Sequence, residues 1–363
     1  MRAENRTVEC ADYLKKNNEK DCLFSVRSAF TNGKEGSARK NWYKAFAITA
    51  RKTHNIVQLY KGELRVMNIA IAGYGNLGKS LEKAVNAEPD MHLQAVFSRR
   101  ESSHPLWARF QDAEKFAGKI DVVLLALGSY DDIEENVNYF APFDTVDSFD
   151  THAKITKYKE RLNAVKPDTV SVCCVGWDPG ILSIVRGAMG ACGGEVATFW
   201  GRGISQGHSH ALRKIRGVYD AVEITTPKED TLKQMRDGCA CEENSRHCRL
   251  CYVACVYGEE TRIAQEIVNM PNYFAGQEVK IEFCSREKIA ELKRSREHSG
   301  EIIARGNGFN ADMKLDVQNN TEFTARIMIT YANAIGDLKR DGYVGALDPY
   351  DIPLKYVALP RLI

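Results

Sequence analysis

The sequence lacks several features that mark whole classes of protein. It has 50 Lys and Arg against 48 Asp and Glu, so its formal charge of +2 gives no global signal for nucleic acid or a membrane surface. No apolar run reaches the roughly 20 residues that a membrane-spanning helix requires. The first residues, MRAENRTVEC, contain no apolar stretch like that of a secretory signal. We therefore expect a cytoplasmic protein that binds neither nucleic acid nor membrane.

Cysteines are present, but their pattern does not favour disulfides or zinc. A chain of 363 residues with 11 cysteines and no export signal is expected to keep them as thiols. One group invites a zinc interpretation: Cys239, Cys241, His247, Cys248, Cys251 and Cys255. However, CRLCYVAC alternates like a strand, which would turn Cys248 and Cys251 to opposite faces and Cys251 and Cys255 to the same face. We expect no metal.

The chain divides into four segments by texture. Residues 1–66 hold 14 Lys and Arg against 7 Asp and Glu, and they are an extension: a disordered tail, upstream sequence from an early start assignment, or a basic arm. Residues 67–190 are predicted to form a dinucleotide-binding domain. Residues 191–318 are predicted to form a substrate-binding and dimerisation domain. The last segment, 319–363, is predicted to return to the first domain.

Strands alternate with helices from Met67 onward, which is typical of a doubly wound parallel sheet of the Rossmann type. The expected strands are apolar runs: 68–73, 92–98, 121–128, 143–150 and 169–176. Further on, GVYDAVEITTP, CRLCYVACVYG and QEVKIEF alternate like strands of an antiparallel sheet, so the second domain is expected to be α+β. Residues 324–342 form a predicted amphipathic helix.

A glycine motif follows the first strand and opens the first helix. It fits G-x-G-x-x-G and comprises Gly73, Tyr74, Gly75, Asn76, Leu77 and Gly78. In this context the glycines allow a tight turn, close approach of a diphosphate and close packing of helix on strand. The free N–H groups of the helix then face the phosphates. The alternative is an ordinary strand–helix turn.

The second strand ends in Ser98, Arg99 and Arg100, where an NAD-binding chain offers an acid to the ribose. An acid would repel a 2′-phosphate, whereas a guanidinium pairs with it. The sequence therefore indicates NADP(H). The alternative is that these arginines merely solvate a strand end.

Two acids follow later strands at the sheet edge where ligands of open α/β folds bind. Asp150 lies in SFDTH, and Asp178 follows Trp177 in GWDPG. Such a pair suits an ammonium group, and one acid is a candidate general base. Helix capping is the alternative for both. In the polar stretch 199–215, a predicted substrate loop, His208 and His210 are expected to be solvated.

Taken together, GYGNLG, FSRR, SFDTH, GWDPG, FWGRGISQGHSHALRKI, GVYDAVEITTP and MPNYF resemble the meso-diaminopimelate D-dehydrogenase family over about residues 67–345. The resemblance implies an NADP-dependent, cytoplasmic homodimer. Its reaction would be reversible oxidative deamination of the D-centre of meso-2,6-diaminopimelate to L-2-amino-6-oxopimelate, which closes to tetrahydrodipicolinate, plus ammonia, in lysine biosynthesis. Alternatives are a broader D-amino-acid dehydrogenase and a non-catalytic NADP(H)-binding protein.

The resemblance also implies roles for residues at matching positions. Asp150 and Asp178 would hold the D-centre ammonium as catalytic residues, beside the substrate-binding residues Trp177, Gln206, Gly207, Thr225, Arg249 and Asn320. One departure concerns the distal end of the substrate. His298 matches the first histidine of a family segment whose second histidine is missing here, with Asn307 and Asn310 as candidate replacements.

Overall fold

The computed structural model describes residues 66–128, 132–306 and 308–357. The predicted extension therefore lies outside the described residues, except for Val66. Within them, no helix is both long and apolar enough to cross a membrane. The parallel sheet, the two smaller sheets and their helices all belong to one compact unit, Arg65–Ile363.

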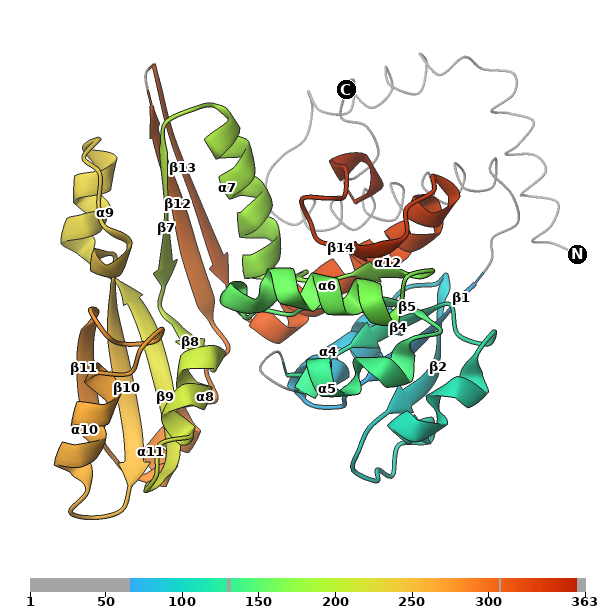
Figure 1. The fold of residues 1–363 in the computed structure, drawn as a ribbon, viewed down its shortest axis with the longest axis horizontal. Helices are drawn as coiled ribbons and strands as arrows, with labels where there is room; N and C mark the ends of the chain where they lie inside the picture. The colour runs from blue at the N-terminus through green and yellow to red at the C-terminus, as the bar shows by residue number, and fades with distance from the viewer. Residues whose placement is uncertain (1–65, 129–131, 307, 358–363) are drawn as a thin grey trace, which may run out of the picture. The chain divides into compact units, whose positions relative to one another are not determined.

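A seven-stranded parallel sheet forms the first part of this unit (Figure 1). In spatial order its strands are β14 (Gly345–Leu347), β6 (Val170–Val172), β5 (Asp144–Asp147), β4 (Val122–Leu125), β1 (Met67–Ala72), β2 (Met91–Phe97) and β3 (Trp107–Ala108). The strand order reverses between β1 and β4, which places a ligand crevice at their carboxyl ends. The predicted strands and the predicted Rossmann-type class are confirmed.

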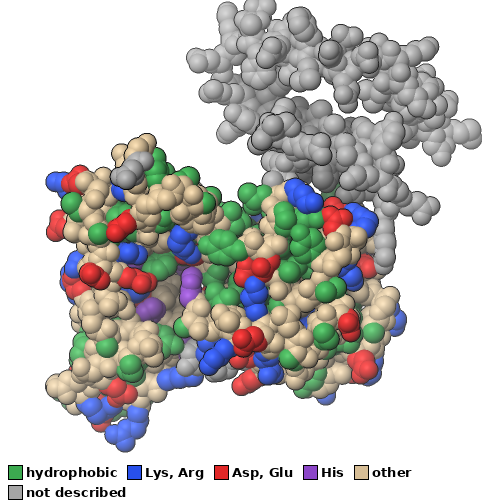
Figure 2. All heavy atoms as spheres, turned by 45° about the horizontal axis from the view of Figure 1, so that its top comes forward, with side chains coloured by type: hydrophobic (Ala, Val, Ile, Leu, Met, Phe, Trp, Pro, Cys, Tyr) green, Lys and Arg blue, Asp and Glu red, His purple; other side chains and the backbone are tan. Residues whose placement is uncertain are grey.

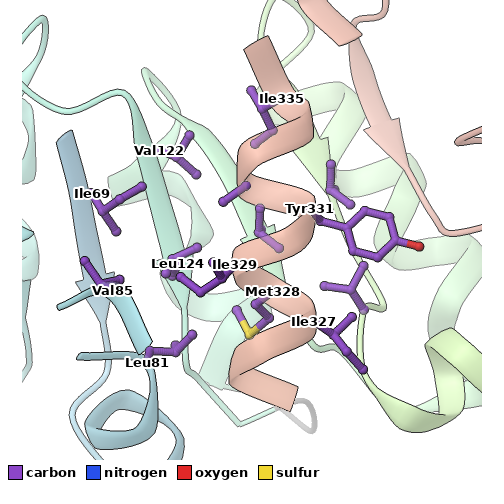
Figure 3. Close-up of a cluster of buried hydrophobic side chains, with 14 of the residues drawn as sticks. Ile69, Leu81, Val85, Val122, Leu124, Ile327, Met328, Ile329, Tyr331 and Ile335 are labelled. Atoms are coloured by element: carbon purple, nitrogen blue, oxygen red, sulfur yellow. The ribbon is translucent and has the colours of Figure 1, made fainter. Parts of the chain in front are cut away.

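Helices cover both faces of this sheet because the sheet side chains alternate between two apolar clusters. One face packs against α4 (Asn76–Val85) and α12 (Asn320–Arg340), the other against α5 (Asp132–Asn136) and α6 (Ile155–Val165). Figure 3 shows α12 crossing the first face, where Met328 and Ile329 lie near Leu124. This long helix starts at Asn320, four residues before the predicted start, because the side chain of Asn319 caps its N-terminus.

Two smaller sheets form the second part (Figure 1). One has the order β11 (Glu278–Phe283), β10 (His247–Cys255), β9 (Val218–Pro227), β8 (Gly203–Ser205), and the other the order β13 (Phe309–Val317), β12 (His298–Gly306), β7 (Glu195–Gly201). Their helices are α7 (Leu182–Ala191), α8 (Gln206–Arg213), α9 (Glu229–Arg236), α10 (Glu260–Val268) and α11 (Arg286–Leu292). The prediction of an antiparallel sheet is wrong for β11, which runs parallel to β10 because α10 connects them as a crossover.

Candidate functional site

The glycine loop follows β1 and leads directly into α4. Gly73 has φ +95°, and a Cβ there would lie 2.4 Å from the carbonyl oxygen of Ala126 at the end of β4. A Cβ on Gly78 would lie 2.1 Å from the carbonyl oxygen of Gly73. Gly75, in contrast, would meet nothing within 4 Å. Two glycines thus serve packing, and the third keeps the space above the helix N-terminus open.

The N-terminus of α4 is suited to an anion. No side chain caps it, and its first turn contains no acid, so its N–H groups keep their positive potential. Tyr74 turns back along the helix, where its hydroxyl donates to Glu82, and this bond is the main reason that the pKa of Tyr74 rises to about 12. Glu82 also lies 3.0 Å from His104, which fixes the loop after β2.

The arginines predicted to bind the 2′-phosphate lie at the end of β2. The Arg99 guanidinium is 54% exposed and pairs with Asp132 at 2.9 Å. Arg100 is exposed, and its backbone carbonyl accepts a bond from the hydroxyl of Ser98. An exposed ion pair is worth roughly 0–1 kcal/mol, so Arg99 can exchange Asp132 for an incoming phosphate at small cost.

A pocket of about 420 Å³ opens at the switch point of the parallel sheet. It brings together several predicted residues: Leu77, Asp150, Trp177, Asp178, Gln206, Gly207 and Asn320. Figure 2 shows the surface hollowed between the two parts of the unit, with histidine side chains at the hollow. The acids arrive from β5 and β6, which are neighbouring strands of the sheet. Residues of the dinucleotide fold and of the substrate loop therefore share one cavity.

Asp178 is buried and fully engaged in this structure. Its carboxylate accepts two bonds from Arg186, with Nη2 at 2.8 Å and Nη1 at 3.3 Å. The indole Nε1 of Trp200 donates to it at 2.5 Å, and the hydroxyl of Ser183 donates at 3.3 Å. A carboxylate has about four acceptor positions, so these donors use the capacity of Asp178. The capping alternative is excluded, because no helix N–H is among its partners.

Asp150 occupies a different environment in the same pocket. It is exposed, and its charge raises the pKa of His298, although burial outweighs this and lowers that pKa overall. His298 packs edge-on against Trp177 with ring centroids 5.4 Å apart, and its Nε2 lies 3.2 Å from the carbonyl oxygen of Ile204. His298 lines a second pocket of about 290 Å³, which shares Gln206 and Asn320 with the first.

Thr225 and Arg249 lie outside the residues that line these two pockets. They are directly paired across β9 and β10, and Arg249 Nη1 donates to Thr225 Oγ1 at 2.7 Å. Trp200 connects this region to Asp178: its backbone N–H donates to His247 Nε2 at 2.8 Å, and the two rings stack. His247 lies two residues before Arg249 on β10, so Trp200 links this part of β10 to Asp178.

The expectation that His208 is solvated is wrong, and so is the candidacy of Asn310 as a replacement for the missing histidine. His208 is not solvated: Nδ1 lies 2.8 Å from Ser205 Oγ, Nε2 lies 3.2 Å from the Tyr273 carbonyl, and burial lowers its pKa to about 3. His210 lines the pocket. Asn310 pairs with Arg305 at the end of the β12–β13 hairpin remote from His298, so it cannot replace the missing histidine, and Asn307 lies outside the described residues.

Sequence reasoning missed Arg186, Trp200 and Glu223. Arg186 is a lone charge in the apolar helix α7, a signal that was available in the sequence.

Cys251 and Cys255 pack in one apolar cluster, as strand alternation predicts. In the described ranges, no group of three or more His, Cys, Asp or Glu side chains is placed to hold a metal ion.

The parallel sheet, the glycine loop at its switch point and the acid-lined pocket define an α/β protein of the Rossmann type with a separate α+β part. Residues 176–323 match the family model "Diaminopimelic acid dehydrogenase C-terminal domain". The meso-diaminopimelate D-dehydrogenase of Lysinibacillus sphaericus is 39% identical over 309 residues, covering 80% of this chain and 95% of the relative.

Solved structures give the same result. The Corynebacterium glutamicum DAP dehydrogenase in complex with DAP matches with a TM-score of 0.75 and 34% identity, over 82% of this chain and 97% of that one. An engineered D-amino acid dehydrogenase bound to NADP+ matches with a TM-score of 0.73 and 34% identity over the same shares. The chain belongs to the meso-diaminopimelate D-dehydrogenase family.

Proposed function

We propose that the chain catalyses the reversible, NADP-dependent oxidative deamination of the D-centre of meso-2,6-diaminopimelate to L-2-amino-6-oxopimelate and ammonia. In the reductive direction the reaction would serve lysine biosynthesis. One observation carries the proposal: acids from two neighbouring strand ends share a pocket with the helix N-terminus of a dinucleotide fold. The proposal also rests on the similarity to relatives described as diaminopimelate dehydrogenases.

The residues present fit NADP(H). The uncapped, acid-free start of α4 and the open space at Gly75 suit the diphosphate, with Asn76 and Leu77 in the first turn. Ser98, Arg99 and Arg100 would hold the 2′-phosphate, because a guanidinium forms charge-assisted, bidentate hydrogen bonds with phosphate. Bound NADP+ would supply the redox chemistry, as the acceptor of a hydride from the D-centre carbon.

Asp150 and Asp178 would act differently on the amine. Asp178 is engaged with Arg186 and Trp200, so it would position these two side chains. Asp150 is exposed on the pocket wall, where it would bind the substrate ammonium and take its proton before the C–H bond breaks. Water then adds to the resulting imine, and loss of ammonia leaves the ketone.

The remaining residues would hold the rest of the substrate. Trp177 would pack against the carbon chain, while Gln206 and Gly207 at the start of α8 would cover it. Asn320, at the start of α12, would bind the distal end together with Thr225 and Arg249, once the two parts of the unit close over the substrate. Closure excludes water from the reacting carbon.

Further proposals concern the assembly, the location and the domains of the chain. The chain would work as a homodimer in the cytoplasm. Its dinucleotide-binding domain would span residues 67–190, and its substrate-binding and dimerisation domain residues 191–318. Residues 319–363 would return to the first domain, which is supported by the pairing of β14 with β6.

A turnover assay tests the proposal. We expect meso-diaminopimelate to reduce NADP+ faster than NAD+, both with the protein that starts at Met1 and with one that starts at Met67. Asp150→Asn is expected to lower kcat by 10²-fold or more, the usual scale for general base catalysis. Equal turnover of many D-amino acids would favour the broader dehydrogenase. NADPH binding without turnover of any amine would leave a non-catalytic binding protein.

A further inference from the structure

Glu223 is a buried carboxylate beneath the predicted distal residues. It lies in the middle of β9, and its side chain is 0% exposed. Strand alternation places Thr225 on the same face, and Arg249 lies directly opposite Thr225 on β10. A carboxylate is seldom fully buried unless it is paired, so its partners decide what it does there.

The partners of Glu223 are the two candidate substrate-binding residues themselves. Thr225 Oγ1 donates to its carboxylate at 3.0 and 3.2 Å, and Arg249 Nη1 lies 3.8 Å from Glu223 Oε1. Arg249 is further fixed by Nε, which donates to Gln277 Oε1 at 2.7 Å. The Arg249 Nη2 nitrogen takes part in none of these contacts. The guanidinium is therefore held rigidly, with Glu223 behind it.

Three titratable groups whose pKa is shifted by this pair, His208, His247 and Cys251, are neutral, and the charged Arg246 is next to His247 in the chain. Burial lowers the pKa of His208 on α8 and of His247 on β10 to about 3, and the positive charge of Arg249 contributes to both shifts. Burial also raises the pKa of the Cys251 thiol. The net charge of the pair and these three groups therefore depends on Glu223 and Arg249 alone. It is zero when Glu223 is ionised, and +1 when Glu223 is protonated or replaced by a neutral residue.

We propose that Glu223 makes the distal subsite electrically neutral, and that it thereby selects a distal end that is a zwitterionic amino acid over one that is a carboxylate alone. The inference rests on the proposed function, because it takes Arg249 as a distal contact. A buried arginine without a counter-charge attracts any carboxylate. When its charge is already neutralised by Glu223, an anionic distal end brings an excess negative charge into a poorly solvated site, whereas a zwitterionic end brings none. Glu223 acts through Arg249 and Thr225, so it is a positioning residue.

The test is Glu223→Gln, which preserves shape and an acceptor for Thr225 but removes the charge. Four D-configured substrates are compared by kcat and KM with NADP+, above the Glu223 pKa of about 7. These are meso-diaminopimelate, D-2-aminopimelate with a distal carboxylate only, D-lysine with a distal ammonium only, and uncharged D-norleucine. We expect the preference for meso-diaminopimelate over D-2-aminopimelate to fall about tenfold, through KM, with D-lysine weakened and D-norleucine unchanged.

Two further variants separate charge from packing. Glu223→Asp keeps the charge and is expected to retain the wild-type order of substrates, even if it is less stable. Glu282→Gln, at an exposed position of β11, is the matched surface control and is expected to change nothing.

Two outcomes would overturn the inference, and they are distinguishable from each other. If the wild type turns over meso-diaminopimelate but Glu223→Gln changes all four substrates by one factor, or changes none, the charge-setting role is wrong and the proposed function stands. Absence of wild-type turnover with every substrate overturns both.

Discussion

Two substitutions in the glycine loop, Gly78→Ala and Gly75→Ala, each add one methyl group. The first is expected to lower stability and the second to weaken cofactor binding. In Gly78→Ala the new Cβ would lie 2.1 Å from the carbonyl oxygen of Gly73, closer than real Cβ atoms approach. The start of α4 must then move away from the loop by about 1 Å. Overpacking of this kind costs about 1–3 kcal/mol of the free energy of unfolding.

Gly75→Ala meets no such obstacle. Its φ of −83° suits alanine, and nothing lies within 4 Å of the added Cβ. Loss of the glycine N-cap costs about 0.5–1 kcal/mol, and the stiffer unfolded chain returns about 0.4–1 kcal/mol, so stability stays within ~0.5 kcal/mol of the wild type. The methyl group instead occupies space that a bound diphosphate needs, and we expect the Kd for NADPH to rise at least tenfold.

Urea unfolding of the cofactor-free protein and NADPH fluorescence titration measure the two quantities separately. Gly336→Ala is the matched control, because Gly336 is exposed inside α12 and has nothing within 4 Å of its Cβ position. It is expected to gain up to ~1 kcal/mol of stability with unchanged NADPH affinity. If Gly75→Ala is destabilised as much as Gly78→Ala, or binds NADPH like the wild type, the role assigned to the open space at Gly75 is wrong.

Three other predictions address charge. Combined Arg99→Ala and Arg100→Ala substitution is expected to reduce kcat/KM for NADP+ by 10²-fold or more while leaving that for NAD+ within about threefold, measured in parallel assays. Arg186→Met strands the buried Asp178 carboxylate and is expected to cost about 3–5 kcal/mol by urea unfolding; a loss below about 1 kcal/mol would contradict the pairing. Burial raises the pKa of Glu223 from 4.5 to about 7, so the folded state holds the proton more tightly and the free energy of unfolding falls as pH rises between these values. The fall due to Glu223 is on the order of 3 kcal/mol. Glu223→Gln is expected to abolish it, which would be seen as a flatter curve of stability against pH.

The cofactor half of the molecule was predictable because its signals are local. A strand, a glycine turn and a helix follow one another within about 20 residues. The atoms that leave no room for a Cβ at Gly73 and Gly78 belong to the same β–α unit or to the neighbouring strand. The convergence of Asp150 and Asp178 was also accessible, since parallel strands end at one edge. Their different partners were not, because Arg186 and Trp200 come from α7 and β7.

The same reasoning explains why Glu223 was missed. In GVYDAVEITTP an acid at an alternating position predicts a solvent-facing side chain, and nothing nearby in the sequence says that α8 covers that face of β9. The backbone N–H of Glu223 donates to Ser209 Oγ of α8 at 2.8 Å, so α8 is fixed against this part of β9. Burial of this residue is a property of tertiary packing, and so is the parallel direction of β11.

The three carboxylates of the region differ in a way that assigns them different tasks. Asp178 and Glu223 are buried, and each is held beside an arginine, so both are parts of the scaffold around the site. A group held in this way contributes geometry and local potential, but it gains little by taking up a proton from the substrate. Asp150 is exposed on the pocket wall, where an incoming ammonium can reach it. The amine chemistry is therefore expected to depend on Asp150, while Asp178 and Glu223 determine the shape and charge of the space that receives the rest of the substrate.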